Sequence, residues 1–375
     1  MPAHAHGSPD QPADAARRRA DTGRHRPSEE IDRGEDGSDA DAACRAAARR
    51  APFRPAWWLP GPHAQTIAGR LLRRPGPLPL RRERIETPDN DFLDLDFVAA
   101  ALPRDAPLAL VLHGLEGSTR RGYMRLTFHA FASRGVRAVG LNFRSCSGEI
   151  NRAARLYHSG ETSDIRHVLD RLVERNGGRP LLAIGYSLGG NALLKYLGEE
   201  GEAARERVNA AAAISVPYDL GAGADALERT AIGRFYTSRF LRTLAGKALS
   251  KAALLDGRCD IDRIRRARTF REFDDAATAP IHGFAGADDY YSRCSSAAWL
   301  HRVRVPTLLI QSDDDPFQPG GGRIALDAAA RNDFVEALVT ERGGHVGFLG
   351  GSPWRPSSWV EEIAAAWLVA DPPPR

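Results

Sequence analysis

One stretch near the middle of the chain constrains its fold more than any other. Residues 181–186 form a short apolar run, Ser187 follows inside a Gly-x-Ser-x-Gly pattern, and residues 191–197 continue with helical spacing. The apolar run has the length of one buried parallel strand. Glycine suits Gly185 and Gly189 because a Cβ at either position would collide with the neighbouring strand or helix. The stretch therefore predicts a strand, a sharp turn and a helix, with the serine hydroxyl held above a sheet.

The same pattern has a plainer interpretation, in which the turn holds a serine without a chemical role. Short patterns of this kind arise by chance in a chain with 36 glycines. The strand on one side and the helix on the other favour the functional interpretation. The first N–H groups of the helix would also point towards the serine oxygen, where negative charge develops in acyl chemistry. Ser187 is therefore the candidate nucleophile.

Strands and helices alternate on both sides of this stretch. Two segments with alternating apolar and polar residues, 84–87 and 92–98, flank a turn cluster and predict an antiparallel hairpin at a sheet edge. Alternation of strands with helices predicts an α/β fold with a mostly parallel sheet and helices on both faces. Beyond the hairpin, strands are predicted at 108–112, 136–142, 209–215, 307–311 and 334–340, the last of the chain, and helices at 124–134, 162–175 and 359–369.

The chain divides into a tail and one large domain. Residues 1–50 contain almost no large apolar side chains, so they cannot bury enough surface to offset the entropy of ordering. We expect this segment to be a disordered N-terminal tail and residues 51–370 to form one α/β domain. Order is expected to begin at residues 53–60, an irregular segment with two tryptophans packed onto the domain. His63 and Gln65 follow, and a structural hydrogen-bonding role is favoured for both over a role in the site.

A long connection interrupts the alternation after Ser215. Connections between neighbouring elements usually contain about 2–6 residues, whereas the next predicted strand begins only at Thr307. We expect a helical cap inserted at about 217–300. Within it, apolar residues alternate with arginines over 234–244, a pattern that could meet a lipid surface. The favoured interpretation is a lid helix lying on the core with a solvated arginine face, which allows at most peripheral membrane contact through the cap.

The composition argues against several classes of protein. The net charge is +4, and the charges are mixed along the chain rather than gathered in a stripe, so nucleic-acid binding is not expected. The N-terminus has no apolar signal-peptide core, and no apolar run approaches the roughly 18 residues that span a bilayer. We expect a cytoplasmic protein. Its cysteines are widely spaced and show no metal-ligand pattern, which indicates free thiols in a reducing compartment: Cys44, Cys146, Cys259 and Cys294.

A serine hydroxyl is a weak nucleophile at neutral pH, so it needs a nearby base and a carboxylate that orients the base. In a chain with this kind of serine turn, the order along the sequence is serine, acid, histidine. His345 follows the last predicted strand and comes directly after the glycine pair at 343–344, which lets the loop bring its ring over the sheet edge, so it is the predicted base. The other histidines considered fit this order less well, because they precede Ser187 or lie in or just after the cap: His113, His158, His282 and His301.

Three adjacent carboxylates follow the strand at 307–311. Asp315 is the predicted acid because Pro316 directly after it stiffens the turn, and Asp314 remains an alternative. Asp313 is expected to be a solvated turn residue. Three acids in a row could also hold Ca²⁺ or Mg²⁺, but such a site needs about six or more oxygens at defined spacing. No such pattern is present, so no metal is expected.

Two backbone N–H groups are needed to hold an oxyanion. The N–H of Leu188, directly after the nucleophile, is the first predicted donor. The second is expected in the loop after the strand at 108–112, where the pair His113 and Gly114 makes the chain turn tightly, and Leu115 is the predicted residue.

At this level of detail the chain resembles the α/β-hydrolase superfamily, and more narrowly its YheT-like branch, akin to the ABHD-type lipid esterases. The resemblance covers about residues 53–370. It implies a mostly parallel eight-stranded sheet with a cap, hydrolysis of carboxylic esters, and neither a metal nor an organic cofactor. Ser145 stands where the branch is expected to have glycine, so a differently shaped loop is expected at 144–149. The resemblance depends on PHAQT (62–66), HGLEGS (113–118), NFR (142–144), CSGE (146–149), YHSGE (157–161), GYSLGGN (185–191), PIHGF (280–284), DDYY (288–291), DDPF (314–317) and GHVGF (344–348).

The predicted function is that of a serine hydrolase acting on carboxylic esters through an acyl-enzyme. Its expected partner is a small acyl ester, with a short or medium acyl group or resembling a monoacylglycerol. Two alternatives stay open at this point. One is an acyltransferase or thioesterase that uses the same residues, and the other is a binding protein with this fold and no turnover.

Overall fold

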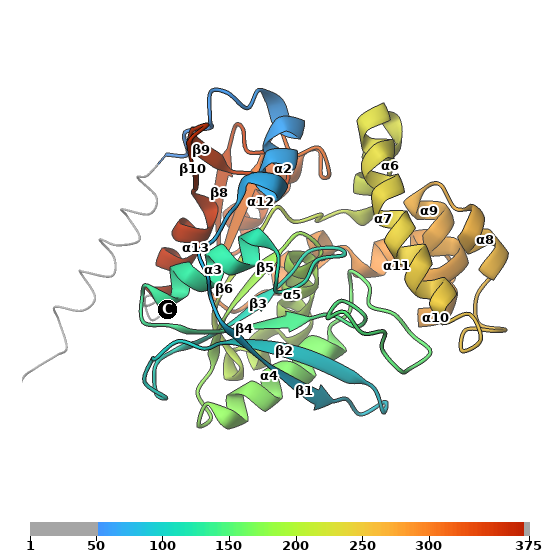
Figure 1. Cartoon of the computed structure of the whole chain (residues 1–375), viewed down its shortest axis with the longest axis horizontal. Coiled ribbons are helices and arrows are strands. Elements are labelled where there is room, and N and C mark those ends of the chain that lie inside the picture. The colour runs from blue at the N-terminus through green and yellow to red at the C-terminus, as the bar shows by residue number, and fades with distance from the viewer. Residues whose placement is uncertain (1–51, 371–375) are drawn as a thin grey trace, which may run out of the picture.

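The computed structural model describes residues 52–370, so the predicted tail at 1–50 lies outside the described residues. Eight strands form one sheet in the order β1-β2-β4-β3-β5-β6-β7-β8 (Figure 1). The pairs β1–β2 and β2–β4 are antiparallel, and the remaining pairs are parallel. The predicted α/β class, with a mostly parallel eight-stranded sheet, is confirmed. The strands are β1 (Leu80–Glu86), β2 (Phe92–Val98), β3 (Leu108–Leu112), β4 (Arg137–Asn142), β5 (Leu181–Tyr186), β6 (Val208–Ile214), β7 (Thr307–Ser312) and β8 (Val335–Thr340).

Helices cover both faces of the sheet. One face carries α4 (Ser163–Arg175), α5 (Leu188–Glu200) and α12 (Gly321–Arg331), and the other carries α3 (Gly122–Ala132) and α13 (Val360–Val369). In β3, Leu108, Leu110 and Leu112 belong to the first of these cores, whereas Ala109 and Val111 belong to the second. Neither face of such a strand contacts solvent, which explains why the central strands are continuous apolar runs.

Between β6 and β7 the chain leaves the sheet and forms a group of helices at one end of the molecule (Figure 1, yellow and orange). This group has a small core of its own that includes Leu241, Leu244 and Phe273. The arginines of α7 are exposed, in agreement with a lid helix, but Phe235 is also 56% exposed. The group comprises α6 (Leu220–Arg229), α7 (Ala231–Ser250), α8 (Ile261–Arg266), α9 (Phe270–Phe273), α10 (Ala279–His282) and α11 (Ala287–Cys294), with short turns of helix at Asp274–Thr278, Ser296–Ala298 and Leu300–Arg302.

Three features differ from the prediction. Helix α2 (Gly61–Leu72) was not predicted, and neither was α12. Both begin with glycine and lack a capping side chain at the N-terminus, so the usual signal for the start of a helix is missing. A small hairpin of β9 (Leu349–Ser352) and β10 (Arg355–Ser358) follows β8, so β8 is not the last strand.

The segment before α2 packs only in part, because Trp58 donates to the carbonyl of Gly351 while Trp57 is 80% exposed.

The described residues contain three of the four cysteines, and Cys44 lies outside them. Cys146 and Cys294 are buried, Cys259 is half-buried, and all three are free thiols. Within residues 52–370, we find no helix with both the length and the apolar character that crossing a membrane requires.

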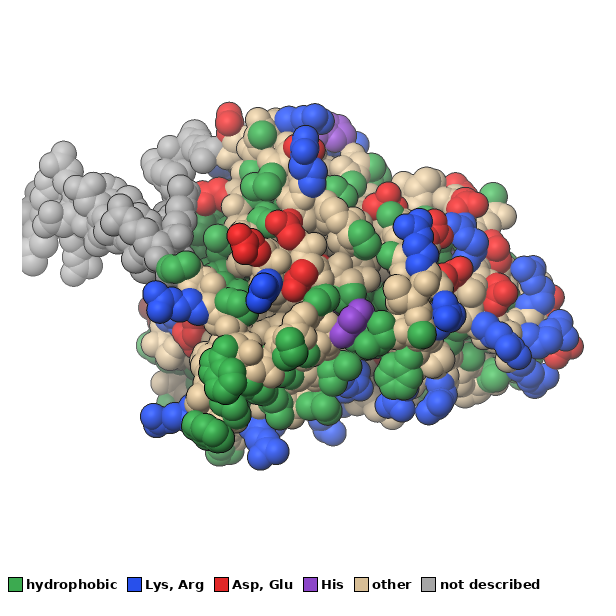
Figure 2. All heavy atoms as spheres, turned by 90° about the horizontal axis from the view of Figure 1, so that it is seen from above, with side chains coloured by type: hydrophobic (Ala, Val, Ile, Leu, Met, Phe, Trp, Pro, Cys, Tyr) green, Lys and Arg blue, Asp and Glu red, His purple; other side chains and the backbone are tan. Residues whose placement is uncertain are grey.

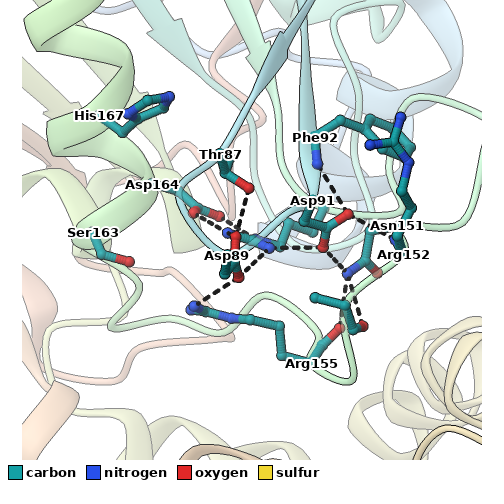
Figure 3. A network of polar contacts seen from close by, with 12 residues as sticks. Thr87, Asp89, Asp91, Phe92, Asn151, Arg152, Arg155, Ser163, Asp164 and His167 are labelled. Carbon is teal, nitrogen blue, oxygen red and sulfur yellow. Dashed lines mark hydrogen bonds and ion pairs between the residues drawn. The ribbon is translucent and has the colours of Figure 1, made fainter.

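A buried arginine ties the edge hairpin to α4, and Figure 3 labels the three carboxylates that it binds, Asp89, Asp91 and Asp164. The guanidinium of Arg144, just after β4, is 1% exposed and binds both oxygens of Asp164 at 2.6 and 2.7 Å. Its third nitrogen donates to Asp91 at 2.7 Å and to Asp89 at 2.9 Å. Since the last two residues lie in the turn between β1 and β2 and Asp164 lies in the first turn of α4, one cation holds three separate segments together.

We expect Arg144→Met to destabilise the fold strongly, because it leaves Asp91 and Asp164 buried without a counter-ion. Breaking a buried pair by removing one partner typically costs about 3–5 kcal/mol. The midpoint of urea unfolding, followed by tryptophan fluorescence, measures the loss. Arg81→Met is the control, because the pair of Arg81 and Glu83 is exposed and such pairs contribute roughly 0–1 kcal/mol. Equal unfolding midpoints for the two variants would contradict the prediction.

Candidate active site

The turn between β5 and α5 has the strained geometry that the sequence predicts. Ser187 adopts φ 51° and ψ −121°, and α5 begins at the next residue. A Cβ on Gly185 would lie 2.5 Å from the carbonyl oxygen of Gly189, and a Cβ on Gly189 would lie 2.5 Å from the carbonyl oxygen of His113. Both glycines are therefore required by close packing, the first against the helix and the second against the end of β3.

Three side chains distant in sequence meet above the carboxyl end of the sheet. The Nε2 atom of His345 lies 2.9 Å from Oγ of Ser187, and its Nδ1 atom lies 2.9 Å from Oδ2 of Asp315. An ionised carboxylate can only accept, so Nδ1 carries the hydrogen and Nε2 is left to accept from the serine hydroxyl. The three residues follow β5, β7 and β8, whose carboxyl ends lie on the same edge of the sheet.

The structure separates the two candidate acids. Asp315 is 2% exposed and also accepts from Nε2 of Gln311 at 3.0 Å and from the backbone N–H of Phe317 at 2.8 Å. Asp314 instead accepts the backbone N–H of Gly344 at 2.8 Å, so it supports the histidine loop and does not contact the ring. Asp313 is exposed, as expected for a solvated turn residue.

Helix α2 holds the histidine loop from behind. The hydroxyl of Thr66 accepts the backbone N–H of His345 at 2.9 Å. The amide of Gln65 is buried and exchanges two hydrogen bonds with the backbone of Leu349, at 2.9 and 3.0 Å. Arg73 donates to the carbonyl oxygens of Val346 and Gly347 at 2.6 and 2.8 Å. The motif at 62–66 is therefore a support for the candidate base, and Gln65 has the structural hydrogen-bonding role favoured from the sequence.

Two further contacts fix the surroundings of the histidine. The ring of Phe317 stacks on that of His345, with centroids 4.2 Å apart. His63, at the start of α2, places Nδ1 3.2 Å from the hydroxyl of Tyr236, which links this helix to α7 of the cap.

The two predicted oxyanion donors both line the cavity beside Ser187. Leu188 is the first residue of α5, so its N–H has no acceptor within the helix. In the loop after β3, the N–H of Gly114 donates to Tyr123 and that of Glu116 donates to Tyr157, at 2.9 and 2.8 Å. The N–H of Leu115 between them has no acceptor among residues 52–370.

The other histidines near the site have structural partners. Burial lowers the pKa of His113 to about 3, so the ring is neutral and bridges the carbonyl oxygen of Gly114 and the N–H of Phe143 at 2.8 and 3.2 Å. His158 and His282 pack edge to face, with centroids 4.4 Å apart, and burial lowers the pKa of each to about 3.

His158 and His282 also form, with Glu161, a cluster whose ligand-type atoms lie within 4.8 Å of one another. Their hydrogen bonds do not suit a divalent ion. The Nδ1 atom of His158 accepts the N–H of Gly160 at 3.2 Å, so the hydrogen of the neutral ring is on Nε2. The guanidinium of Arg155 already pairs with the carboxylate of Glu161. We therefore interpret the cluster as packed polar side chains.

A cavity of about 220 Å³ joins the site to the cap. The cap contributes mostly apolar residues to its wall, together with polar ones that include Lys247 and Asp274. Asp274 accepts from the hydroxyls of Tyr291 and Thr278, at 2.8 and 2.5 Å, and burial raises its pKa to about 6. The apolar residues that the cap contributes are Leu220, Ala224, Leu227, Phe240, Leu244, Phe270, Phe273 and Ile281.

Comparison with known proteins agrees with this geometry. Residues 107–352 match the alpha/beta hydrolase fold family, and the chain belongs to that family. It is 40% identical to YheT of Escherichia coli over 310 residues, which cover 82% of this chain and 90% of that protein. The resemblance to the YheT-like branch is thus confirmed.

Two further relatives have names that state an activity. The chain is 30% identical to phospholipase ABHD3 of Mus musculus over 324 residues, covering 85% of this chain and 78% of that protein. It is 31% identical to the monoacylglycerol lipase of Saccharomyces cerevisiae over 296 residues, covering 77% and 63%. Among solved structures, a 2,6-dihydroxy-pseudo-oxynicotine hydrolase matches with a TM-score of 0.50 at 14% identity, covering 82% of this chain and 71% of that one, which shows the shared fold alone.

We expect Thr66→Val to lower kcat with little change in KM, because it removes the acceptor for the N–H of His345 and loosens the base without altering the cavity. Small displacements of reacting groups can cost on the order of 10²-fold in rate, and we expect a loss of about 10-fold or more. Steady-state kinetics with p-nitrophenyl butyrate measure both constants. A change in KM alone, or none in either, would show that α2 does not position the base.

Proposed function

We propose that Ser187, Asp315 and His345 are a catalytic triad that cleaves carboxylic esters through an acyl-enzyme. The observation that carries the proposal is the unbroken chain of hydrogen bonds from carboxylate to imidazole to hydroxyl, with 2.9 Å at each link. The chain is a carboxylic ester hydrolase by its family and its named relatives. The proposal adds which residues act and on which esters.

The geometry supports the following steps. His345 takes the proton of the Ser187 hydroxyl through Nε2 as the serine oxygen attacks the ester carbonyl carbon. Asp315 keeps the hydrogen on Nδ1 and stabilises the imidazolium that forms. The N–H groups of Leu115 and Leu188 hold the oxyanion, and each such donor typically contributes about 10²–10³ in rate. The imidazolium then protonates the leaving alcohol, and water activated by the same ring releases the acid.

The cavity supports a small acyl ester as the substrate. Its apolar wall belongs to the cap, so an acyl chain would lie there, with its carbonyl carbon beside Ser187. A volume of about 220 Å³ suits a short or medium acyl group. Esters of this size include simple alkyl esters and compounds similar to monoacylglycerols.

We expect a fluorophosphonate probe to label Ser187 covalently, because only a serine with an aligned base attacks phosphorus at a useful rate. Ser187→Ala should abolish labelling and lower kcat on p-nitrophenyl esters by about 10⁶-fold, the scale known for triad serines. Mass spectrometry of the labelled peptide identifies the site. Folded wild-type protein that stays unlabelled while a known esterase reacts would refute the proposal and favour a binding protein without turnover. Product partition in the presence of alcohol or thiol acceptors distinguishes hydrolysis from acyl transfer.

The two neighbouring acids give a matched pair of variants. Asp315→Asn should lower kcat by roughly 10⁴-fold, because an amide can donate to Nδ1 and stabilise the wrong tautomer. Asp314→Asn should have a much smaller effect, because its side-chain oxygen can still accept the N–H of Gly344. The kcat values of both variants on one ester test the assignment. If Asp314→Asn were the more damaging change, Asp314 would be the acid.

A further inference from the structure

Two arginines line the cavity, and a third lies on the cap near enough to Arg70 to act on its charge. Arg70 of α2 is exposed and also lines the cavity, Arg121 lines it from the loop before α3, and Arg239 is exposed on α7. None of them forms an ion pair with a carboxylate among residues 52–370. The only partner of these guanidinium groups there is the carbonyl oxygen of Glu116, which accepts from Arg121 at 2.7 Å.

The contrast with Arg73, three residues further on at the C-cap of α2, shows that this is not a general property of arginines in this region. Arg73 is buried, pairs with Glu361 at 3.0 Å and donates to the carbonyl oxygens of the histidine loop. Lys247, another cation that lines the cavity, pairs with Glu116 at 2.6 Å. The structural cations near the site therefore have acidic partners, whereas these three arginines have none within residues 52–370.

The helices bring these arginines to one side of the cavity. Contact of His63 with Tyr236 sets α2 beside α7. Arg70 is seven residues after His63 and so lies on the same side of α2, and Arg239 is three residues after Tyr236 on α7. Figure 2 views the molecule from the side on which α2, α6 and α7 lie in Figure 1, and Lys and Arg side chains are frequent there over the cap.

The arrangement is unfavourable unless an anion is present. Partial burial, and then the positive charges of Arg121 and Arg239, lower the pKa of Arg70. Like charges held together at the edge of an apolar cavity repel one another, and a bound anion relieves the repulsion. A guanidinium also offers paired N–H donors that match the oxygens of a phosphate or a carboxylate.

We propose that the substrate of this site is an acyl ester whose alcohol portion carries an anionic group, bound by Arg70 together with Arg121 and Arg239. The acyl chain lies against the apolar wall of the cap, the ester carbonyl lies at Ser187, and the anion lies beside these arginines. This inference rests on the proposed function, because it names the class of ester that the same triad cleaves. An anionic bilayer surface is the other source of negative charge, but Arg70 and Arg121 line the cavity itself, which favours the substrate.

A matched pair of water-soluble esters tests the proposal: 1-hexanoylglycerol 3-phosphate and 1-hexanoylglycerol, both used as monomers. We expect wild-type protein at low ionic strength to favour the phosphate ester by about 10-fold or more in kcat/KM, and added salt to reduce this ratio because it screens the arginines. Arg70→Ala should reduce the ratio by about 10-fold, and Arg70→Lys should restore part of it, since a lysine keeps the charge without the paired donors.

Arg234→Ala is the matched control. It removes one exposed arginine from the same helix as Arg239, but the guanidinium of Arg234 donates to the carbonyl oxygen of Glu228. The ratio should stay at its wild-type value in this variant. A ratio near one in wild-type protein at low ionic strength, or a ratio that Arg70→Ala leaves intact, overturns the proposal. Phosphatidylglycerol vesicles could instead accelerate hydrolysis of the neutral ester in an Arg70-dependent way, while the kcat/KM ratio of the two esters stays near one. That result would assign the arginines to a bilayer surface and would also overturn the proposal.

Calorimetric titration of the Ser187→Ala protein with the two esters separates this inference from the proposed function. Tighter binding of the phosphate ester, weakened by adding Arg70→Ala, supports the anion site without any turnover. Equal affinities overturn the inference even where both esters are cleaved in a Ser187-dependent reaction. Failure of wild-type protein to cleave either ester would instead count against the proposed function.

Discussion

A parallel sheet places the carboxyl ends of all its parallel strands at one edge, and the candidate site depends on this constraint. Ser187, Asp315 and His345 are far apart in the sequence, yet each follows a strand of the same parallel set. The sheet alone brings the three backbones near one another. The hydrogen bonds between the side chains need more, because a reacting group displaced by about 1 Å can lose on the order of 10²-fold in rate. The rest of the precision comes from the loops and from the elements packed behind them.

Those loops hold residues in backbone conformations that most side chains avoid. Ser187, Val346 and Phe348 have φ values of 51°, 53° and 44°, a region that costs about 1–3 kcal/mol for a residue other than glycine. Such conformations persist only where the surroundings supply enough contacts. Around the histidine loop these contacts come from α2, through Thr66 and Arg73, and from the close approach of Gly69, whose Cβ would lie 3.0 Å from Gly347. Helix α2 thus offsets strain that the site requires.

The sequence predicted the parts of this design that depend on local pattern. Apolar runs such as that of β3 and the Gly-x-Ser-x-Gly turn at Ser187 have one favoured structure, and they were found where expected. The choice between Asp314 and Asp315 depended on which carboxylate faces the ring, which adjacent residues in one turn do not reveal. Helix α2 escaped prediction because it begins at Gly61 and Pro62 without a capping side chain. Its hydrogen bonds and glycine contacts with the histidine loop are visible only in three dimensions. The backbone conformation of Ser145 could not be predicted from the sequence either. Its φ of 61° lies in the region that favours glycine, which explains why glycine suits this position.

Helix α7 of the cap carries two kinds of cation near the site, one buried and paired with a carboxylate and one exposed without an acidic partner in the described part of the chain. Lys247 is mostly buried and pairs with Glu116, whose φ of 51° shapes the loop that presents the N–H of Leu115. A buried cation needs such a partner because its desolvation is otherwise uncompensated. Arg239, two turns earlier on the same helix, is exposed and lacks an acidic partner among the described residues. A displacement of α7 would move both cations together. The same helix therefore supplies a contact to the loop that carries Leu115 and a charge near Arg70.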